Sequence, residues 1–157
     1  QVKAGFLYKL LLFVEWPKEA FTGSDNTITI GILGKDPFGD VFDPVAGQPI
    51  HGRSLVIKRF KENTPPEELR NCHLLFISTS LEASAHQIIA SLEKDPVLTV
   101  SEMKGFADAG GMVNLIVSGS GRVGFEINTA SAERSGIRFR AKLLRLSARV
   151  IEDTYEK

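Results

Sequence analysis

The sequence predicts a single α/β domain over residues 1–157, with a mixed, mostly parallel sheet of about six strands and helices on both faces. Its 157 residues suit one domain. Short apolar runs with strand periodicity alternate with segments of helical periodicity, an order typical of α/β sheets. Right-handed crossovers between parallel strands would place helices on both faces. The sequence shows no internal repeat and no linker.

Hydrophobic periodicity predicts the first helix and the first strands. Apolar residues recur with helical spacing over 6–14, and Pro17 ends this helix because proline disfavours the helical conformation of the preceding residue. Residues 27–33 alternate, with three isoleucines on one face, and predict a strand. Residues 55–60 predict a second strand.

Two helix-start signals fall among these elements. Asp36-Pro37 predicts a short helix ending near Phe42, because aspartate can accept from free N–H groups and proline fits the first helical position. A loop containing glycines and prolines follows over 45–53. A proline pair and two glutamates predict a brief helical turn over 65–68.

The middle of the chain predicts a strand, a helix and another strand. The apolar run 74–78 is typical of a strand buried on both faces. Thr79 and Glu82 form a capping-box pattern before a helix over 81–92, and an Asp-Pro pair then stops it. A strand over 97–100 follows.

The last part predicts a hairpin and a capped helix. Residues 119–124 match the dinucleotide-binding pattern G-x-G-x-x-G, but the following residues alternate as a strand rather than open a helix. We therefore interpret them as the turn between strands 113–117 and 122–127. Asn128 is placed to cap a helix that Gly136 closes.

Composition excludes several classes of protein. Nineteen basic residues balance nineteen acidic ones, which argues against a general nucleic-acid binder. No apolar run approaches the roughly 20 residues of a membrane span. The single cysteine, Cys72, cannot form an internal disulfide or a zinc site alone. The sequence therefore predicts no metal site, no cofactor, no nucleic-acid partner and no membrane-spanning segment.

Two features near loops and helix ends could bind a partner or ligand. In His51-Gly52-Arg53, the glycine lets the backbone turn so that imidazole and guanidinium can meet one ligand. Alternatively, Arg53 pairs with a carboxylate such as Glu126 and fixes the loop. Trp16 either fills the core or is an exposed anchor, since tryptophan is enriched at interface hot spots.

A basic stripe is expected along the last helix, which covers roughly 139–146. Its members recur at i, i+4, i+7 and i+11: Arg138, Lys142, Arg145 and Arg149. A solvated face is one interpretation. The other is docking against an acidic protein surface or anionic head groups, because clustered charge attracts partners even at zero net charge.

Nine stretches, in this order over nearly the whole chain, resemble the YfiR-like family of bacterial periplasmic proteins. They are residues 3–9, 13–17, 31–39, 51–53, 72–77, 97–101, 110–112, 121–128 and 143–146. The resemblance implies an exported, dimeric α/β domain with a cleaved signal peptide, which would account for a chain starting at Gln1 rather than Met. It also implies a periplasmic regulator that holds an inner-membrane diguanylate cyclase inactive and is itself sequestered by an outer-membrane lipoprotein. Cyclic-di-GMP output, and with it biofilm formation, would then fall.

The resemblance carries no catalytic residues, so we expect a regulator rather than an enzyme. Disulfides tie redox state to repression in the best-understood member, whereas Cys72 has no second cysteine here; an intermolecular Cys72 pair stays open. The alternative is a periplasmic small-ligand sensor domain of another signalling system, such as a sensor kinase pathway. In either case the expected contact or ligand surface comprises Trp16, His51, Arg53, Glu126 and Asn128, with the basic stripe as a second surface.

Overall fold

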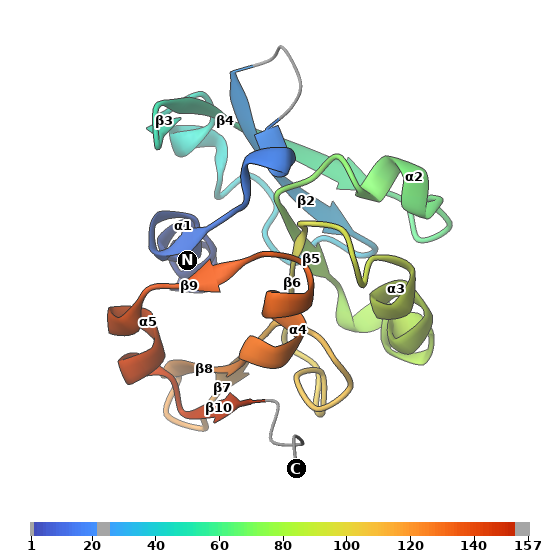
Figure 1. Cartoon of the computed structure of the whole chain (residues 1–157), viewed down its shortest axis with the longest axis vertical. Helices are drawn as coiled ribbons and strands as arrows, with labels where there is room; N and C mark the ends of the chain where they lie inside the picture. Colours follow the sequence, from blue (N-terminus) through green and yellow to red (C-terminus); the bar gives the residue numbers. More distant parts are fainter. Residues whose placement is uncertain (1, 22–25, 153–157) are drawn as a thin grey trace.

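The computed structural model describes residues 2–21 and 26–152 and confirms one mixed α/β domain (Figure 1). Eight strands form the main sheet, in the spatial order β10-β8-β7-β6-β5-β2-β4-β3, and a separate antiparallel pair joins β1 to β9. The main strands are β2 (Thr27–Leu33), β3 (Pro49–Ile50), β4 (Arg53–Phe60), β5 (Leu74–Ile77), β6 (Leu98–Ser101), β7 (Val113–Val117), β8 (Val123–Asn128) and β10 (Arg149–Ile151). The pair consists of β1 (Val14–Glu15) and β9 (Arg138–Phe139).

Neighbouring strands β4, β2, β5, β6 and β7 run parallel. The chain adds β4 on one side of β2 and then β5, β6 and β7 on the other, so the direction of winding changes between β2 and β5. β8 returns antiparallel to β7, β10 lies parallel to β8, and β3 pairs antiparallel with β4. The sheet is therefore mixed and mostly parallel.

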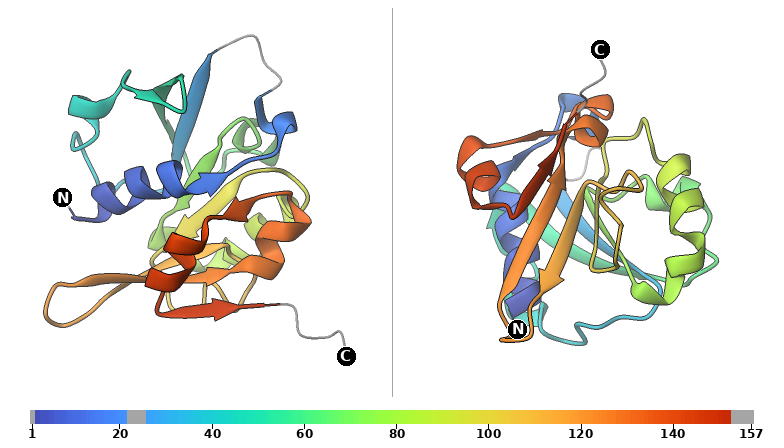
Figure 2. Two further views of the ribbon diagram at one scale, coloured as in Figure 1. Left: turned by 60° about the vertical axis from the view of Figure 1, so that its left-hand side comes forward. Right: turned by 90° about the horizontal axis from the view of Figure 1, so that it is seen from below.

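Two apolar clusters lie on opposite faces of the sheet, because alternate residues of a strand point to opposite sides. In β5, Leu74 and Phe76 join one cluster, and Leu75 and Ile77 join the other. Figure 2 shows α1 and α5 on one side of the sheet and α3 on the other. The helices are α1 (Val2–Phe13), α2 (Pro66–Leu69), α3 (Ala85–Ser91), α4 (Thr129–Arg134) and α5 (Ala141–Leu146), with 3-10 segments η1 (Lys18–Phe21), η2 (Asp43–Val45) and η3 (Thr79–Ser84).

The main sheet has eight strands rather than about six. The additional strands β3 and β10, like both strands of the β1–β9 pair, are only two or three residues long. Such short segments show no readable period, so their pairing depends on where the longer strands lie.

The predicted helix over 36–42 is wrong. Asp36 Oδ1 does accept from two backbone N–H groups, those of Phe38 at 2.7 Å and Gly39 at 3.3 Å. The chain then turns at Gly39, whose φ of +60° lies in the left-handed region that favours glycine. The aspartate therefore closes a local turn, and helical structure appears only later, as η2.

The predicted helix over 81–92 forms with a different start. Ser78, not Thr79, is the capping residue, and its hydroxyl accepts from the Ser80 N–H at 3.2 Å. Leu81 leaves helical geometry with φ of −107° and ψ of 22°, so the chain is kinked inside η3 before α3 begins at Ala85. Burial of Leu81 in the second cluster accompanies the kink.

The hairpin and the capped helix are confirmed. The Ser118 N–H donates to Arg122 O at 2.9 Å in the turn between β7 and β8, so the glycine-rich motif opens no helix. Asn128 Oδ1 accepts from the Ser131 N–H at 3.0 Å at the start of α4, and Gly136 follows its end with a φ of +77°.

Candidate functional site

Aromatic and cationic side chains gather at the amino ends of β2 and β5, in what we call the aromatic cluster: Trp16, Phe21, Arg53 and His73. The His73 ring stacks on Phe21 with centroids 4.6 Å apart, and the Arg53 guanidinium carbon lies 3.9 Å from the Phe21 centroid. The Trp16 Nε1–H donates to His73 O at 2.9 Å, and its ring meets the imidazole edge-on at 6.3 Å. Two sequence-predicted site residues, Trp16 and Arg53, therefore share one cluster.

Backbone groups hold His73 in one neutral tautomer. Its Nδ1 accepts from the Thr29 N–H at 3.0 Å, so the proton resides on Nε2, which donates to Ala20 O at 2.9 Å. Burial lowers the pKa of His73; the Ala20 carbonyl opposes this shift, and the nearby Arg53 charge adds to it. His73 is therefore a neutral, fixed ring at neutral pH rather than a mobile proton carrier.

A pocket of about 460 Å³ opens beside the aromatic cluster on the face of the sheet that also carries α3. Its lining residues are Glu19, Ala20, Phe21, Thr27, Thr29, Val56, Lys58, Arg70, Asn71, Cys72, His73 and Pro96. Two cations, one carboxylate and several hydroxyl or amide groups surround the Phe21 and His73 rings, so the pocket can accept a polar group with an apolar part.

Cys72 lines this pocket with its thiol largely buried. Burial raises the pKa of the Cys72 thiol to about 12, although the Lys58 charge acts in the opposite direction. The thiolate is the reactive form of cysteine, so at neutral pH this thiol behaves as a small core group. Within the described residues, no group of three or more His, Cys, Asp or Glu side chains is placed to hold a metal.

His51 lies apart from the aromatic cluster. It adopts a φ of 52°, in the left-handed region, and its Nε2 lies 2.7 Å from Leu11 O. The ring thus attaches the β3–β4 turn to the last turn of α1. Although His51 and Arg53 are only two residues apart, their side chains contact different groups: His51 contacts Leu11 O, and Arg53 lies on the Phe21 ring.

Glu126 and Asn128 also have separate roles. Glu126 Oε2 pairs with Arg149 Nε at 3.1 Å, whereas Arg53 lies on Phe21, so the Arg53–Glu126 pair considered from the sequence does not form. Asn128 is buried; it caps α4 and donates from Nδ2 to Ala107 O at 2.8 Å. The five predicted surface residues therefore belong to several places in the fold.

The basic stripe does not follow one helical face. Arg138 belongs to β9 and Arg149 to β10, and only Lys142 and Arg145 lie on α5. The helix is limited to Ala141–Leu146 because extended segments pair with β1 on one side and β8 on the other. Arg149 is also paired with Asp108, at 2.8 Å, and with Glu126.

Ligands of open α/β sheets usually bind at the carboxyl ends of strands where the winding direction changes. In this fold that place lies after the carboxyl ends of β2 and β5, and the segments that follow these two strands pack against each other there. The Lys35 N–H donates to Ser80 Oγ at 3.2 Å, and a Cβ on Gly34 would lie 2.9 Å from that oxygen. The aromatic cluster and its pocket lie instead at the amino ends of the same strands.

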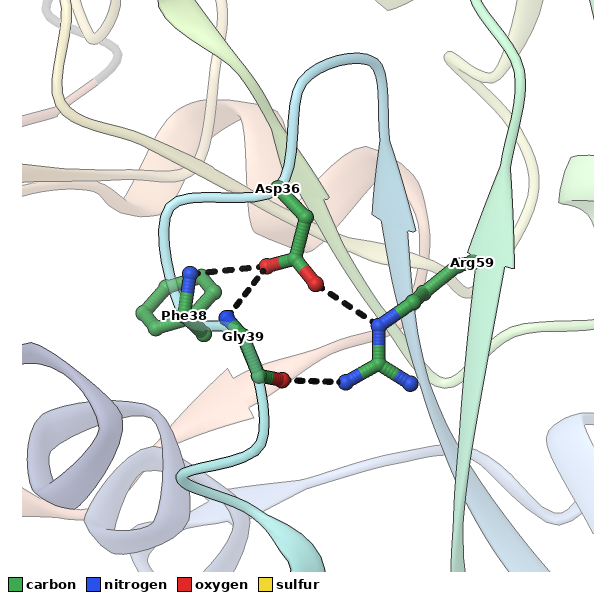
Figure 3. Close-up of polar contacts among 4 residues, drawn as sticks. All are labelled: Asp36, Phe38, Gly39 and Arg59. Carbon is green, nitrogen blue, oxygen red and sulfur yellow. Dashed lines mark hydrogen bonds and ion pairs between the residues drawn. The ribbon is translucent and has the colours of Figure 1, made fainter.

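Sequence reasoning missed an ion pair next to this contact. Arg59 Nε binds Asp36 Oδ2 at 2.7 Å, and Arg59 also donates to Gly39 O at 2.6 Å (Figure 3). Partial burial acts to raise the pKa of Asp36, but the bonds from Arg59, Phe38 and Gly39 outweigh it and lower the pKa. The pair fixes the loop after β2. The aspartate before proline in the sequence predicts a helix start and gives no sign of this ion pair.

The strands and helices described above form a small mixed α/β domain. The YfiR/HmsC-like family model matches residues 1–148, and the chain belongs to this family. The family is one of periplasmic regulatory proteins in diguanylate cyclase signalling. No helix among residues 2–21 and 26–152 is long and apolar enough to cross a bilayer.

A solved structure with a related fold is the crystal structure of a conserved domain protein from Vibrio cholerae O1 biovar eltor str. N16961. Its TM-score to this chain is 0.56 at 12% sequence identity, and the match covers 80% of this chain and 55% of that chain. The present chain thus spans just over half of that protein. At this identity the likeness concerns the fold alone.

Proposed function

We propose that this chain is a periplasmic regulator that inhibits an inner-membrane diguanylate cyclase by contacting the periplasmic part of that enzyme. The observation that carries the proposal is the family match over residues 1–148. Inhibition is conformational: the regulator binds the inactive state of the cyclase more tightly and so increases its population. A shift from one per cent to 99 per cent inactive needs about 5.5 kcal/mol of differential affinity.

A mixed basic and apolar surface supports a protein contact. We call it the α1–α5 face; its members are Lys9, Leu12, Lys142, Arg145 and Leu146. Lys142 Nζ lies 5.6 Å from the Phe13 ring, so α5 and α1 adjoin at this face. Leu12 is 38% exposed and Leu146 59% exposed. Apolar groups bordered by cations suit a partner with an acidic rim around an apolar centre.

Charge reversal on α5 tests the contact. We expect the double variant Lys142→Glu, Arg145→Glu to recover the cyclase about tenfold less well in a crosslinked pull-down from bacterial envelope, since two favourable contacts become repulsive. Cellular cyclic-di-GMP should rise in the same strain. The matched control is Lys61→Glu, an exposed charge just after β4.

Equal recovery by the double variant and the control would remove the α1–α5 face from the proposal. Recovery of no membrane cyclase by the unmodified chain would contradict the proposed function itself. Mass spectrometry of the captured proteins also shows whether an outer-membrane lipoprotein, the proposed sequestering partner, is present. Light scattering after size exclusion tests the proposed homodimer.

A second candidate function is a small-ligand sensor, and the pocket beside the aromatic cluster favours it. Lys58 and Arg70 line this pocket, and Arg53 lies against its aromatic wall. A carboxylate or phosphate compound bound there should raise the melting temperature with concentration, by mass action. Lys58→Gln should reduce that rise, whereas Lys61→Gln should not; equal rises would contradict this function.

A further inference from the structure

A different pocket, of about 560 Å³, lies over β7, β8 and β10, away from the aromatic cluster and the α1–α5 face. The segment between β6 and β7 closes one side of it. We call it the β7–β10 pocket. Its lining residues are Glu102, Met103, Lys104, Gly105, Asp108, Asn114, Leu115, Ile116, Val117, Glu126 and Arg149.

A row of polar residues crosses the sheet from β6 to β10, and its last three members, Asn114, Glu126 and Arg149, line this pocket. Register pairs join Ser101 to Asn114, Asn114 to Glu126, and Glu126 to Arg149. Register partners on neighbouring strands point to the same face of a sheet, so all four side chains share one side. Asn114 and Glu126 are thus adjacent hydrogen-bonding groups in the middle of the row.

Asn114 lacks a hydrogen-bond donor that its position calls for. The residue is 4% exposed, and its Oδ1 is a buried atom with no hydrogen-bond partner among the described residues. Buried polar atoms of folded proteins nearly always have a partner, and an exception marks an absent water, ion or ligand. Asn114 lines the pocket, so a donor bound there would lie next to this amide.

The carboxylates around Asn114 are held in place. Glu126 is 17% exposed and pairs through Oε2 with Arg149, and Glu102 is 17% exposed and pairs with Lys3 at 2.8 Å. A carboxylate accepts several hydrogen bonds, so each retains acceptor capacity beside its present partner. A group with several N–H donors and a positive charge would therefore complete the row.

We propose that the β7–β10 pocket binds a primary alkylammonium group, with the ammonium between Asn114 and Glu126. An ammonium has three donors and a positive charge, which matches an amide oxygen beside a carboxylate. Ile116 lies two residues after Asn114 on the same face of β7, is 39% exposed, and offers apolar surface to the alkyl chain. The chemistry is that of a free diamine or of a lysine side chain on a partner.

The test is a titration of the full chain with n-butylammonium, followed through the backbone amide signals of Leu115 and Ile116, which line the pocket and are present in every variant, in ¹⁵N-labelled protein. We expect saturable shifts of those signals. Tetramethylammonium, which has the charge but no N–H donor, should shift them at least about tenfold less effectively, because charge-assisted hydrogen bonds provide the discrimination.

Two variants locate the site and one controls for charge. Glu126→Gln should weaken butylammonium binding about tenfold. Asn114→Leu should abolish it and still fold, because removing a buried group without a partner does not destabilise the sheet; circular dichroism checks the fold. The control Glu93→Gln, on a carboxylate paired with Arg134 elsewhere, should leave binding unchanged.

Absence of saturable shifts, or equal weakening in Glu126→Gln and Glu93→Gln, would overturn the proposal. Comparing cadaverine with Nα-acetyl-lysine-methylamide, whose side-chain ammonium is free, distinguishes a free diamine from a lysine side chain as the ligand. Tighter binding of cadaverine supports a free diamine, and tighter binding of the lysine derivative supports a lysine side chain of a partner. Because the pocket is separate from the α1–α5 face, these results do not depend on the cyclase contact.

Discussion

At the scale of single residues, the contacts of His73 make the local structure sensitive to pH. Protonated His73 would lose the Thr29 N–H bond to Nδ1 and would carry a charge beside Arg53. Phe21 fixes both groups, because one guanidinium and one imidazole lie on its ring. The conformation of η1 is therefore coupled to the charge state of a residue before β5.

Acid should destabilise the protein through His73. The folded pKa lies below the usual 6.5, so below about pH 6.5 the unfolded chain binds more protons than the folded one and the free energy of unfolding falls as pH falls. The limiting slope for one proton is about 1.4 kcal/mol per pH unit. Above pH 6.5 this contribution is constant.

Urea unfolding followed by Trp16 fluorescence between pH 7.5 and 5 measures the effect. His73→Gln should flatten the pH dependence, whereas His86→Gln, on an exposed side chain of α3, should preserve it. If both variants kept the slope of the parent chain, another group would be responsible. The Asp36 carboxyl, whose pKa is lowered, titrates below this range.

The residues selected from the sequence as one surface occupy different places in the structure. The sequence points to Trp16 through the enrichment of tryptophan at interfaces and to Arg53 through the turn at Gly52; both side chains belong to the aromatic cluster, although His51 does not join Arg53 there. Phe21 and His73 escaped the same reasoning, because their contacts join segments far apart in the chain. Asn128, predicted to be a surface residue, is buried; it caps α4 and donates to Ala107 O.

At the scale of elements, caps and turns determine where helices begin. Ser78 and Asn128 each supply a side-chain acceptor to a backbone N–H two or three residues later. Asp36 does the same without starting a helix, because Gly39 turns the chain. A side chain that accepts from a backbone N–H two or three residues later can thus either start a helix, as at Asn128, or close a turn, as at Asp36.

Loss of the Asn128 cap should destabilise α4. Asn128→Ala removes the acceptor for the Ser131 N–H and the donor to Ala107 O, and we expect a decrease of about 1–2 kcal/mol or more in the free energy of unfolding. Asn128→Asp should retain the cap and lose only the donor, so its decrease should be smaller. Chemical denaturation measures both; the opposite order would contradict the capping role.

Element prediction succeeded where the local signal was long or chemically specific. The β7–β8 hairpin and the α4 cap followed from turn residues and one asparagine, and the long strands followed from alternation. The four short strands β1, β3, β9 and β10 could not be predicted, because two or three residues pair only once their neighbours are in position. The same pairing divides the basic stripe between two strands and a helix.

At the scale of the whole molecule, the two apolar clusters lie on opposite faces of one sheet, and the same strands contribute side chains to both. Leu74 and Phe76 serve one cluster while Leu75 and Ile77 serve the other. If a strand such as β5 left the sheet, the side chains of both clusters would be exposed to water. The domain should therefore unfold as a unit.

Core truncation on either face tests this cooperativity. Leu7→Ala in α1 and Leu92→Ala after α3 each remove a fully buried side chain, and each should lower the free energy of unfolding by about 2–5 kcal/mol. Trp16 fluorescence and far-ultraviolet circular dichroism should report coincident transitions in both variants. A separate early transition in Leu92→Ala would show that the α3 face unfolds independently.

The burial of Cys72 has a consequence for how the domain reaches its native state in an oxidising compartment. Disulfide exchange needs an accessible thiolate, which the native chain withholds by covering the sulfur and raising its pKa to about 12. Before the sheet closes, that protection is absent. For a chain that folds in an oxidising compartment, oxidation and burial therefore compete for this one sulfur atom, and the rate of sheet formation decides which comes first.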